Sequence, residues 1–310
     1  MKKFIYFILF MFLFICNVKA LDIKLTNKVI EFDQVDGFEL QGFTSTDKYI
    51  FMILTNDDDS LSNIKVFDIN SYKLIKDIYG SSLGHANDVT YNSKENVIYI
   101  AISGGSDKLA TFNGDDFSYM GSVDIDLPVR SISYIDKLDQ YAVRMVSTGY
   151  LLDNDFNKVN NTPFVYGMNI SKMIGRQGWT YYNDFIYYCN WSWIRMGGDG
   201  SNTILIYDLD GKFVNSYHTN TTVGEIEGIS FNNDKMILGF NEYEGKVAFY
   251  IEDIIDVDYI KIDTDEDEVT VSDTINKEIK NDRKPFYIGF ITGFITVGVL
   301  KTIQRKEKSK

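Results

Sequence analysis

A five-residue pattern of polar and apolar positions occurs five times along the chain. Its first position is polar, its third is apolar and its fourth is a small hydroxyl residue, in the segments QGFTS, NDVTY, RSISY, QGWTY and EGISF, which begin at Gln41, Asn87, Arg130, Gln177 and Glu227. Successive segments begin 46, 43, 47 and 50 residues apart. Intervals of this length are typical of the blades of a β-propeller.

Further short apolar stretches follow each of these repeated segments and predict additional strands. KYIFMILT and NVIYIAIS are two examples, and outer strands follow them with turn residues at Asn113-Gly114 and Asp210-Gly211. Four short strands per repeat and no convincing amphipathic helix predict an all-β fold, a five-bladed β-propeller over residues 21–262. We expect the segment Ile23–Phe32 to add a strand to the last blade, because joining the first and last blades removes open sheet edges.

The repeated segment is expected to form the innermost strand of each blade. Alternation along a strand places the apolar third position against a neighbouring blade and the hydroxyl of the fourth position on the opposite face. If the five registers match, the polar first positions form a ring at one mouth of the central channel. Such a ring is also expected in a propeller without any ligand, because a channel mouth is solvated.

Several groups near this expected ring are capable of binding. The ligand-binding candidates are Gln41, Asn87, Arg130, Gln177, Glu227, His85, Trp191 and Trp193. Carboxylate, amide and imidazole groups gathered at this mouth could hold a hard cation such as Ca²⁺ through oxygen ligands, whereas Arg130 favours an anionic group. The two tryptophans suggest a sugar site, but alternating tryptophans that leave a strand are also typical of packing between blades.

Two groups of propellers resemble this chain. GEIEGISF and GHANDVTYN resemble blade openings of the gluconolactonase-like, calcium-dependent propellers, which implies Glu227 and Asn87 as metal ligands. RQGWTYYNDFIYYCNW, with IYDLDGKFVNS, is more similar to secreted propellers of Gram-positive bacteria and their phages, including the helveticin J group. The first family has six blades where this chain has five repeats, so the resemblance implies a binding geometry and not lactonase activity.

Both ends of the chain predict cellular addresses. Residues 1–20 have the lysines, the apolar run and the small residues before a cleavage site that are typical of a secretory signal peptide. Residues 263–284 are read as an acidic stalk, 285–303 as a single transmembrane helix and 304–310 as a basic cytoplasmic tail. The alternative for 285–303 is a buried core helix. Gly289 and Gly293 form a GxxxG pair that would permit helix-mediated dimerisation.

Charge and motif content narrow the classes of function. The whole chain carries −13; the signal contributes three positive charges and the tail from Lys301 a net four, so residues 21–300 carry −20. Such a charge argues against nucleic acid as a partner. Two histidines and a single cysteine after the signal, Cys189, cannot supply a zinc cluster, and no G-x-S-x-G, Walker or dinucleotide motif is present.

Two functions of different class fit these features. The favoured one is a membrane-anchored extracellular propeller that binds a surface glycan or protein ligand at its channel mouth without chemical turnover. The alternative is a tethered hydrolase of glycosidase or lactonase type, with or without Ca²⁺. Glycoside hydrolysis needs only two suitably spaced carboxyl groups, for which Asp88, Glu225 and Glu227 are the catalytic candidates.

Overall fold

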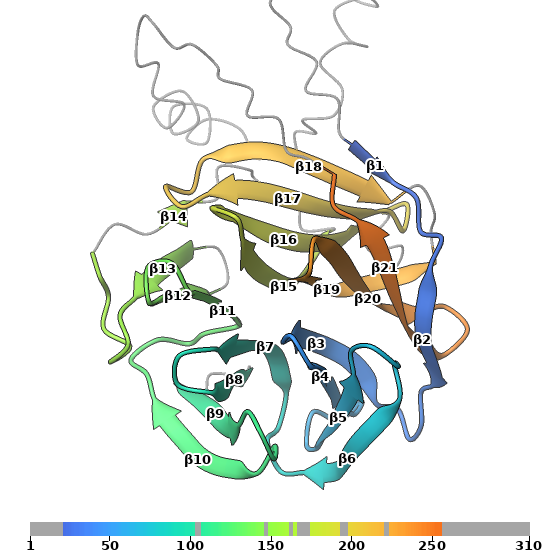
Figure 1. Ribbon diagram of the computed structural model, residues 1–310, viewed down its shortest axis with the longest axis horizontal. Coiled ribbons are helices and arrows are strands. Elements are labelled where there is room, and N and C mark those ends of the chain that lie inside the picture. Colours follow the sequence, from blue (N-terminus) through green and yellow to red (C-terminus); the bar gives the residue numbers. More distant parts are fainter. Residues whose placement is uncertain are drawn as a thin grey trace, which may run out of the picture. The chain divides into compact units, whose positions relative to one another are not determined.

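The protein is a five-bladed β-propeller, as the repeats predict. The computed structural model describes residues 21–102, 107–145, 148–160, 164–165, 174–192, 198–219 and 223–255. All regular structure in these residues is β, arranged in five sheets that surround a central axis (Figure 1).

The blades follow one another along the chain. The first blade consists of β3 (Glu39–Ser45), β4 (Tyr49–Thr55), β5 (Ser62–Asp68) and β6 (Leu74–Ser81), and the second of β7 (Ala86–Asn92), β8 (Val97–Ile102), β9 (Lys108–Asn113) and β10 (Tyr119–Asp124). The third consists of β11 (Ser131–Ile135), β12 (Gln140–Arg144), β13 (Thr148–Leu152) and β14 (Phe164–Val165). The fourth contains β15 (Ile174–Tyr182), β16 (Phe185–Ser192), β17 (Asn202–Asp208) and β18 (Phe213–Thr219), and the fifth contains β19 (Gly224–Asn232), β20 (Lys235–Glu242) and β21 (Lys246–Asp253).

Each blade begins at the axis and runs outward. Its first strand lies at one edge of the sheet, and the following strands pair antiparallel in chain order. The innermost strands β3, β7, β11, β15 and β19 contact one another around the axis. These are the strands that carry the repeated segments, which confirms their expected position.

The N-terminal strands link the last two blades. β2 (Lys28–Asp33) pairs antiparallel with β21, with Glu31 opposite Ala248, and this confirms the predicted closure of the ring. The prediction was wrong for the start of the segment, because β2 begins only at Lys28 and Ile23 belongs to β1 (Leu21–Ile23), which pairs parallel with β18 in the fourth blade. Ile23 is buried in the apolar cluster between the fourth and fifth blades, so this short strand also covers the outer edge of β18.

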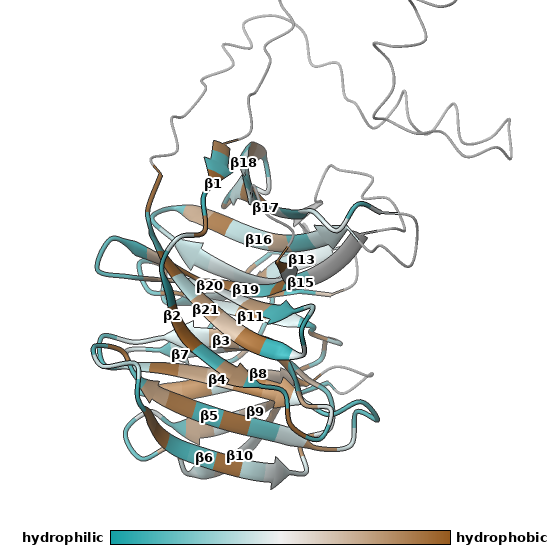
Figure 2. Ribbon diagram, turned by 90° about the vertical axis from the view of Figure 1, so that its right-hand side faces the viewer, coloured by the Kyte–Doolittle hydropathy of each residue, from teal (hydrophilic) through white to brown (hydrophobic). Residues whose placement is uncertain are grey.

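The hydrophobic core is divided into five clusters, each between two neighbouring blades. The third position of every repeated segment is buried in the cluster shared with the preceding blade; Phe43, for example, meets Phe249 of the fifth blade edge-on at 4.8 Å. In Figure 2 the strands such as β4 are mainly hydrophobic, whereas the connecting turns are hydrophilic. Packing between blades thus explains why the third position is always apolar.

The segments predicted to direct the protein to the membrane are not part of the described propeller. Residues 1–20, 263–284, 285–303 and 304–310 lie outside the described residues, so the signal peptide, stalk, membrane helix and tail stay predictions. Among the described residues no helix is long and apolar enough to cross a membrane.

Candidate functional site

Four of the five innermost strands contain a β-bulge at the start of the repeated segment. The pairing register shifts between Leu40 and Gly42, between Ala86 and Asp88, between Arg176 and Trp179, and between Ile226 and Gly228. A bulge places an extra residue in one strand and turns its side chain away from the regular alternation. In these four strands the first-position side chains therefore do not follow simple alternation.

The carboxyl group of Asp88 occupies the axis between the blades. Asp88 is only 2% exposed. Its Oδ1 accepts a hydrogen bond from its neighbour Val89 N–H at 2.9 Å, and its Oδ2 accepts from Ile132 N–H at 3.2 Å and Trp179 N–H at 3.4 Å. One side chain of the second blade thus ties the innermost strands of the third and fourth blades together.

Glycines make room for this carboxyl group. A Cβ atom on Gly42 would lie 2.9 Å from the Cα of Asp88, and one on Gly178 would lie 3.0 Å from its Oδ1. The first distance is shorter than real Cβ contacts, and a Cβ atom on Gly178 would also lie 2.9 Å from the backbone oxygen of Glu227, so both positions require glycine. Asp88 therefore lies among the innermost strands of the first, third and fourth blades.

A buried arginine lies near Asp88. The Arg144 guanidinium donates to Ser131 Oγ at 2.6 Å and to the Gln177 carbonyl at 3.2 Å, and it lies over the Tyr188 ring at 5.1 Å. Burial raises the pKa of Asp88 to about 7, although backbone hydrogen bonds and the charge of Arg144 act in the opposite direction. Asp88 and Arg144 are thus structural groups of the channel interior.

Glu227 lies in the interior and not at a solvated rim. It is 3% exposed, and its Oε1 accepts a hydrogen bond from Asn241 Nδ2 at 2.8 Å, while Asn241 also bonds the backbone of Leu40 in the first blade. Burial raises the pKa of Glu227 well above its ordinary value, and the negative charge of Glu225 adds to this effect. Glu225 itself accepts a hydrogen bond from Gln177 Nε2.

Three other predicted residues form a chain of hydrogen bonds across the first-position end of the channel. His85 Nε2 lies 3.1 Å from Asn87 Oδ1, and Asn87 Nδ2 donates to the carbonyl of Arg130 at 2.6 Å. His85 Nδ1 also lies 2.6 Å from Asp59 Oδ1. Arg130 is exposed and Gln41 is partly exposed. Of these side chains, Asn87 is the one that joins two blades, through the backbone of Arg130.

The predicted calcium site does not fit this arrangement. Both polar atoms of the Asn87 amide are already hydrogen-bonded, and no described hydrogen bond joins Asn87 to Glu227, whose Oε1 is held by Asn241. The described residues contain no group of three or more His, Cys, Asp or Glu side chains placed to hold a metal ion. A cation bound by Glu227 and Asn87 would require both side chains to move.

The two remaining candidates from the sequence are the tryptophans. Trp191 is buried, with 8% of its surface exposed, and Trp193 lies outside the described residues. Cys189 is fully buried, and burial raises the pKa of its thiol well above its ordinary value. A sugar site at Trp191 would therefore need the chain around it to open.

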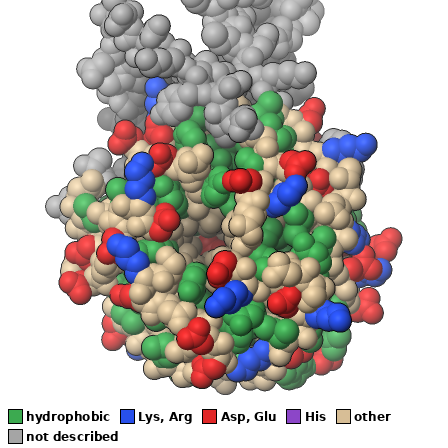
Figure 3. Space-filling view, in the orientation of Figure 1, with side chains coloured by type: hydrophobic (Ala, Val, Ile, Leu, Met, Phe, Trp, Pro, Cys, Tyr) green, Lys and Arg blue, Asp and Glu red, His purple; other side chains and the backbone are tan. Residues whose placement is uncertain are grey.

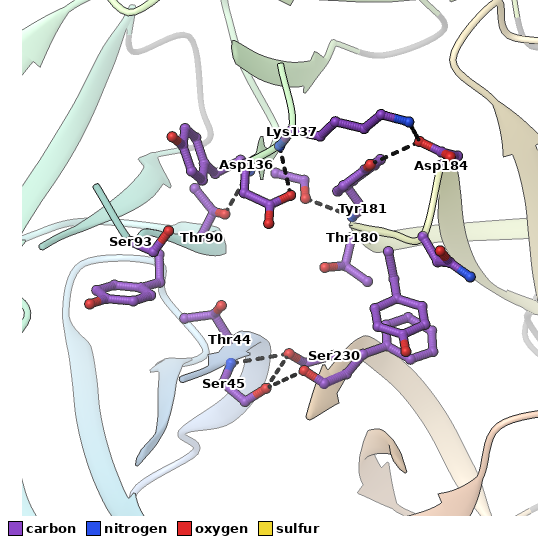
Figure 4. Close-up of a pocket in the computed structure, with 16 residues that line it drawn as sticks. Thr44, Ser45, Thr90, Ser93, Asp136, Lys137, Thr180, Tyr181, Asp184 and Ser230 are labelled. Atoms are coloured by element: carbon purple, nitrogen blue, oxygen red, sulfur yellow. Dashed lines mark hydrogen bonds and ion pairs between the residues drawn. The ribbon is translucent and has the colours of Figure 1, made fainter. Parts of the chain in front are cut away.

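A cavity of about 490 Å³ opens at the other end of the channel. Figure 3 shows a hollow at the centre of the propeller face, and Figure 4 shows the side chains that line the cavity. The fourth positions contribute Thr44, Thr90, Ser133, Thr180 and Ser230. The fifth positions contribute Ser45, Tyr91, Tyr134, Tyr181 and Phe231. The hairpins after β11 and β15 add Asp136, Lys137, Asn183 and Asp184. We call this end the hydroxyl mouth.

Three of the five hydroxyl groups hold neighbouring blades together. A fourth-position oxygen accepts a hydrogen bond from the fifth-position N–H of the next blade, from Tyr134 N to Thr90 Oγ1 at 2.8 Å, from Tyr181 N to Ser133 Oγ at 2.7 Å and from Ser45 N to Ser230 Oγ at 3.1 Å. Thr44 and Thr180 make no hydrogen bond to another described residue through their side chains, and both are partly exposed. The repeated hydroxyl therefore has a structural role in some blades and is available to a ligand in others.

The tyrosine rings of the hydroxyl mouth are fixed by the hairpin turns. Tyr91 OH donates to Asn96 Oδ1 at 3.0 Å and Tyr134 OH to Asp139 Oδ1 at 2.6 Å. Asn96 and Asp139 occupy turn positions with φ of 57° and 56°, a conformation that Asn and Asp tolerate better than most residues. The hydroxyl groups are thereby engaged, and the aromatic rings stay in place beside the cavity.

An ion pair joins the third and fourth blades at the hydroxyl mouth. Lys137 Nζ lies 2.8 Å from Asp184 Oδ1, and Tyr181 OH donates to the same oxygen at 3.3 Å. The hydrogen bond from Lys137 lowers the pKa of Asp184. The carboxylate of Asp136 has no such cation: among the described residues, only the backbone N–H of Lys137 donates to it, at 2.8 Å.

The sequence also contains a pattern that marks this end of the channel, and it lies at the fifth positions of the repeated segments and not at the first. The fifth position is aromatic in four of the five segments, at Tyr91, Tyr134, Tyr181 and Phe231. Adjacent hydroxyl and aromatic positions that recur in this way are compatible with the lining of a cavity as well as with packing between blades. The fourth and fifth positions lie beyond the bulges, towards the other end of the innermost strands.

Comparisons with known proteins find only distant likenesses. No protein-family model and no curated protein sequence matches the chain. A hydrazine synthase chain of Kuenenia stuttgartiensis is similar over 66% of this chain with 13% identity and a TM-score of 0.39, and this chain spans 62% of its length. A protein of Bacteroides fragilis described as exported is similar over 76% of this chain and 100% of its own, with 11% identity and a TM-score of 0.42. Likenesses at this level carry no argument about function.

Proposed function

We propose that this protein is a cell-surface propeller that binds a glycan at the hydroxyl mouth. The observation that carries the proposal is the cavity of about 490 Å³, within the size range of ligand sites, where hydroxyl groups from all five blades and aromatic rings from four of them converge. Hydroxyl groups exchange hydrogen bonds with sugar hydroxyls, and the rings offer apolar surface to the C–H faces of a sugar. The ligand is thus assigned to the opposite end of the channel from the first-position residues.

Binding has more support than hydrolysis. Asp88 and Glu227, two of the three catalytic candidates of the hydrolase alternative, are buried and do not line the cavity. Of the two carboxylates that do line it, Asp184 is paired with Lys137, and a low pKa makes it a poor proton donor near neutral pH. The hydroxyl mouth therefore lacks a well-suited pair of general acid and general base among its described residues.

The cell-surface address rests on the sequence alone. The signal at residues 1–20 and the apolar segment at residues 285–303 are the features that support it. Deleting residues 285–310 is expected to release the protein from the membrane fraction into the medium, which immunoblotting of fractionated cells would measure. Continued sedimentation with membranes would contradict the anchor. The resemblance to secreted propellers of Gram-positive bacteria and phages likewise rests on the sequence alone.

A glycan array tests binding and its place together. The probe is the labelled full chain, kept in a detergent whose headgroup is not a sugar. Thr180→Phe puts a large side chain into the hydroxyl mouth at a position without described hydrogen bonds, and Gln41→Phe puts the same bulk at the other end. We expect wild type and Gln41→Phe to bind the same glycans and Thr180→Phe to lose them. Loss in Gln41→Phe alone would move the site to the first-position end, and no binding by any of the three would refute the proposed function.

A further inference from the structure

The hydrogen-bonding capacity of the hydroxyl mouth is unevenly distributed. Thr90 Oγ1 and Ser133 Oγ each accept a backbone N–H, so the proton of each hydroxyl is left to donate elsewhere. Thr44 and Thr180 add two further hydroxyls that no other described residue engages through their side chains. The lining therefore offers several neutral donors to whatever enters the cavity.

The strongest acceptor in the cavity is the carboxylate of Asp136. Figure 4 shows Asp136 on the side of the third blade, with its carboxylate directed towards the centre of the ring of hydroxyls. It accepts one hydrogen bond, from the N–H of Lys137, which leaves most of its acceptor capacity for a ligand. Its position is set by the tight hairpin between β11 and β12, in which Leu138 N–H bonds the Ile135 carbonyl at 3.1 Å.

The charge of the cavity is negative. Among the residues that line it, the charge of Lys137 is matched by Asp184 at 2.8 Å, so Asp136 leaves one negative charge uncompensated. The whole region of residues 21–300 also carries −20, which gives an anion no attraction at longer range. An acidic ligand would thus meet a like charge at contact distance, whereas a pair of sugar hydroxyls would donate to it.

We propose that Asp136 determines the specificity of the hydroxyl mouth, accepting hydrogen bonds from neighbouring hydroxyls of an uncharged saccharide end and excluding saccharides that end in an acidic sugar. This inference rests on the proposed function, since it concerns the ligand of the same cavity. The hydroxyls of Thr44 and Thr180 donate to the remaining sugar oxygens. Specificity arises here as much from the repulsion of the acid as from attraction of the neutral sugar.

Matched oligosaccharide pairs that differ only in a terminal hexose or the corresponding hexuronic acid test the inference. The full chain and two variants, Asp136→Asn and Asp126→Asn, are titrated against each pair at low salt. Asp126 is an exposed acid in the connection between the second and third blades that does not line the cavity. We expect wild type and Asp126→Asn to prefer the neutral partner by about tenfold, because a like charge at contact repels the acid.

Asp136→Asn is expected to bring the two affinities together, because the neutral amide weakens the hexose contact and removes the repulsion of the acid. Salt at about 0.5 M should narrow the wild-type preference in the same direction, since it screens exposed charges. Equal or stronger binding of the acidic partner by wild type would overturn the inference, and so would a preference that Asp136→Asn leaves unchanged. In both cases binding itself, and its loss in Thr180→Phe, would leave the proposed function standing. If wild type bound neither the neutral nor the acidic oligosaccharide, both the inference and the proposed function would be refuted.

Discussion

The two ends of the central channel differ in how far their polar side chains are already engaged. At the first-position end, His85, Asn87, Gln177 and Glu225 hydrogen-bond to one another or to the backbone of the next blade. At the hydroxyl mouth, Thr44, Thr180 and Asp136 surround an open volume and keep most of their hydrogen-bonding capacity. The charged and amide groups of the first-position end thus have a structural role. The hydroxyl groups of the hydroxyl mouth are the ones that a ligand can reach.

The buried carboxyl group between the two ends should produce the largest effect on stability. Asp88→Ala leaves three backbone N–H groups without their acceptor and Arg144 without a nearby negative charge, and we expect a loss of about 3 kcal/mol or more. Urea unfolding of the full chain measures it. Asp136→Ala, which removes an exposed carboxylate at the hydroxyl mouth, should change the same free energy by less than about 0.5 kcal/mol. Equal losses in the two variants would contradict the assignment of Asp88 to the interior.

The pH dependence of stability should report Glu227 next. Burial raises the pKa of Glu227 in the folded protein, with Glu225 and Glu39 adding to it, so the folded state binds a proton that the unfolded state has released. The stability that this proton supplies is complete below the ordinary pKa of glutamic acid and is lost as pH rises through the folded pKa. Wild type should therefore lose stability as pH rises above the ordinary pKa of glutamic acid, and Asp88, whose pKa burial raises to about 7, should contribute in the same direction.

Glu227→Gln keeps an oxygen for Asn241 Nδ2 but carries no titrating group. Its loss of stability over the same pH range should be smaller than that of wild type, because the titrating group is absent. Glu244→Gln, in an exposed hairpin, should follow the wild-type curve. The measurement is the free energy of unfolding at matched pH values, and a Glu227→Gln curve parallel to wild type would show that Glu227 is not buried as described.

The hydroxyl groups should separate into two classes with a smaller effect. Thr90→Val keeps the shape of the side chain but removes the acceptor of Tyr134 N–H, so a loss of about 1 kcal/mol is expected. Thr180→Val, at the equivalent position of the fourth blade, removes no described hydrogen bond and should leave stability unchanged while weakening glycan binding. Thermal melts and binding titrations of the two variants give the comparison. Similar melts would refute the division of the fourth positions into structural and available hydroxyls.

The architecture could be predicted because the fold is repeated and each repeat obeys one packing rule. Phe43, Val89 and the other third positions must be apolar wherever one blade meets the preceding one, so five copies of the same requirement appear as five similar segments. The closure by β2 follows from the same need to cover a sheet edge. The short pairing of Leu21–Ile23 with β18 was not foreseen, because three residues are too few to form a pattern.

The place of the site could not be predicted in the same way. Strand alternation assumes a regular ladder, and the bulges at Gln41, Asn87 and Glu227 break it where the candidate residues stand. The burial of Glu227 depends on Asn241 from another strand, and the position of Asp88 depends on Gly42 and Gly178, so neither can be read from its own segment. Which end of the channel remains open is a consequence of these contacts.

Hydrogen–deuterium exchange of the full chain with and without a saturating glycan tests the central claim most directly, because it reports both ends of the channel in one experiment. A ligand in the hydroxyl mouth should slow exchange in the inner hairpins around Ser93, Asp136–Lys137 and Asn183–Asp184, and leave residues 84–88 and 225–228 unchanged. Slower exchange at residues 84–88 and 225–228, with the three hairpins unaffected, would place the ligand at the first-position end and contradict the account.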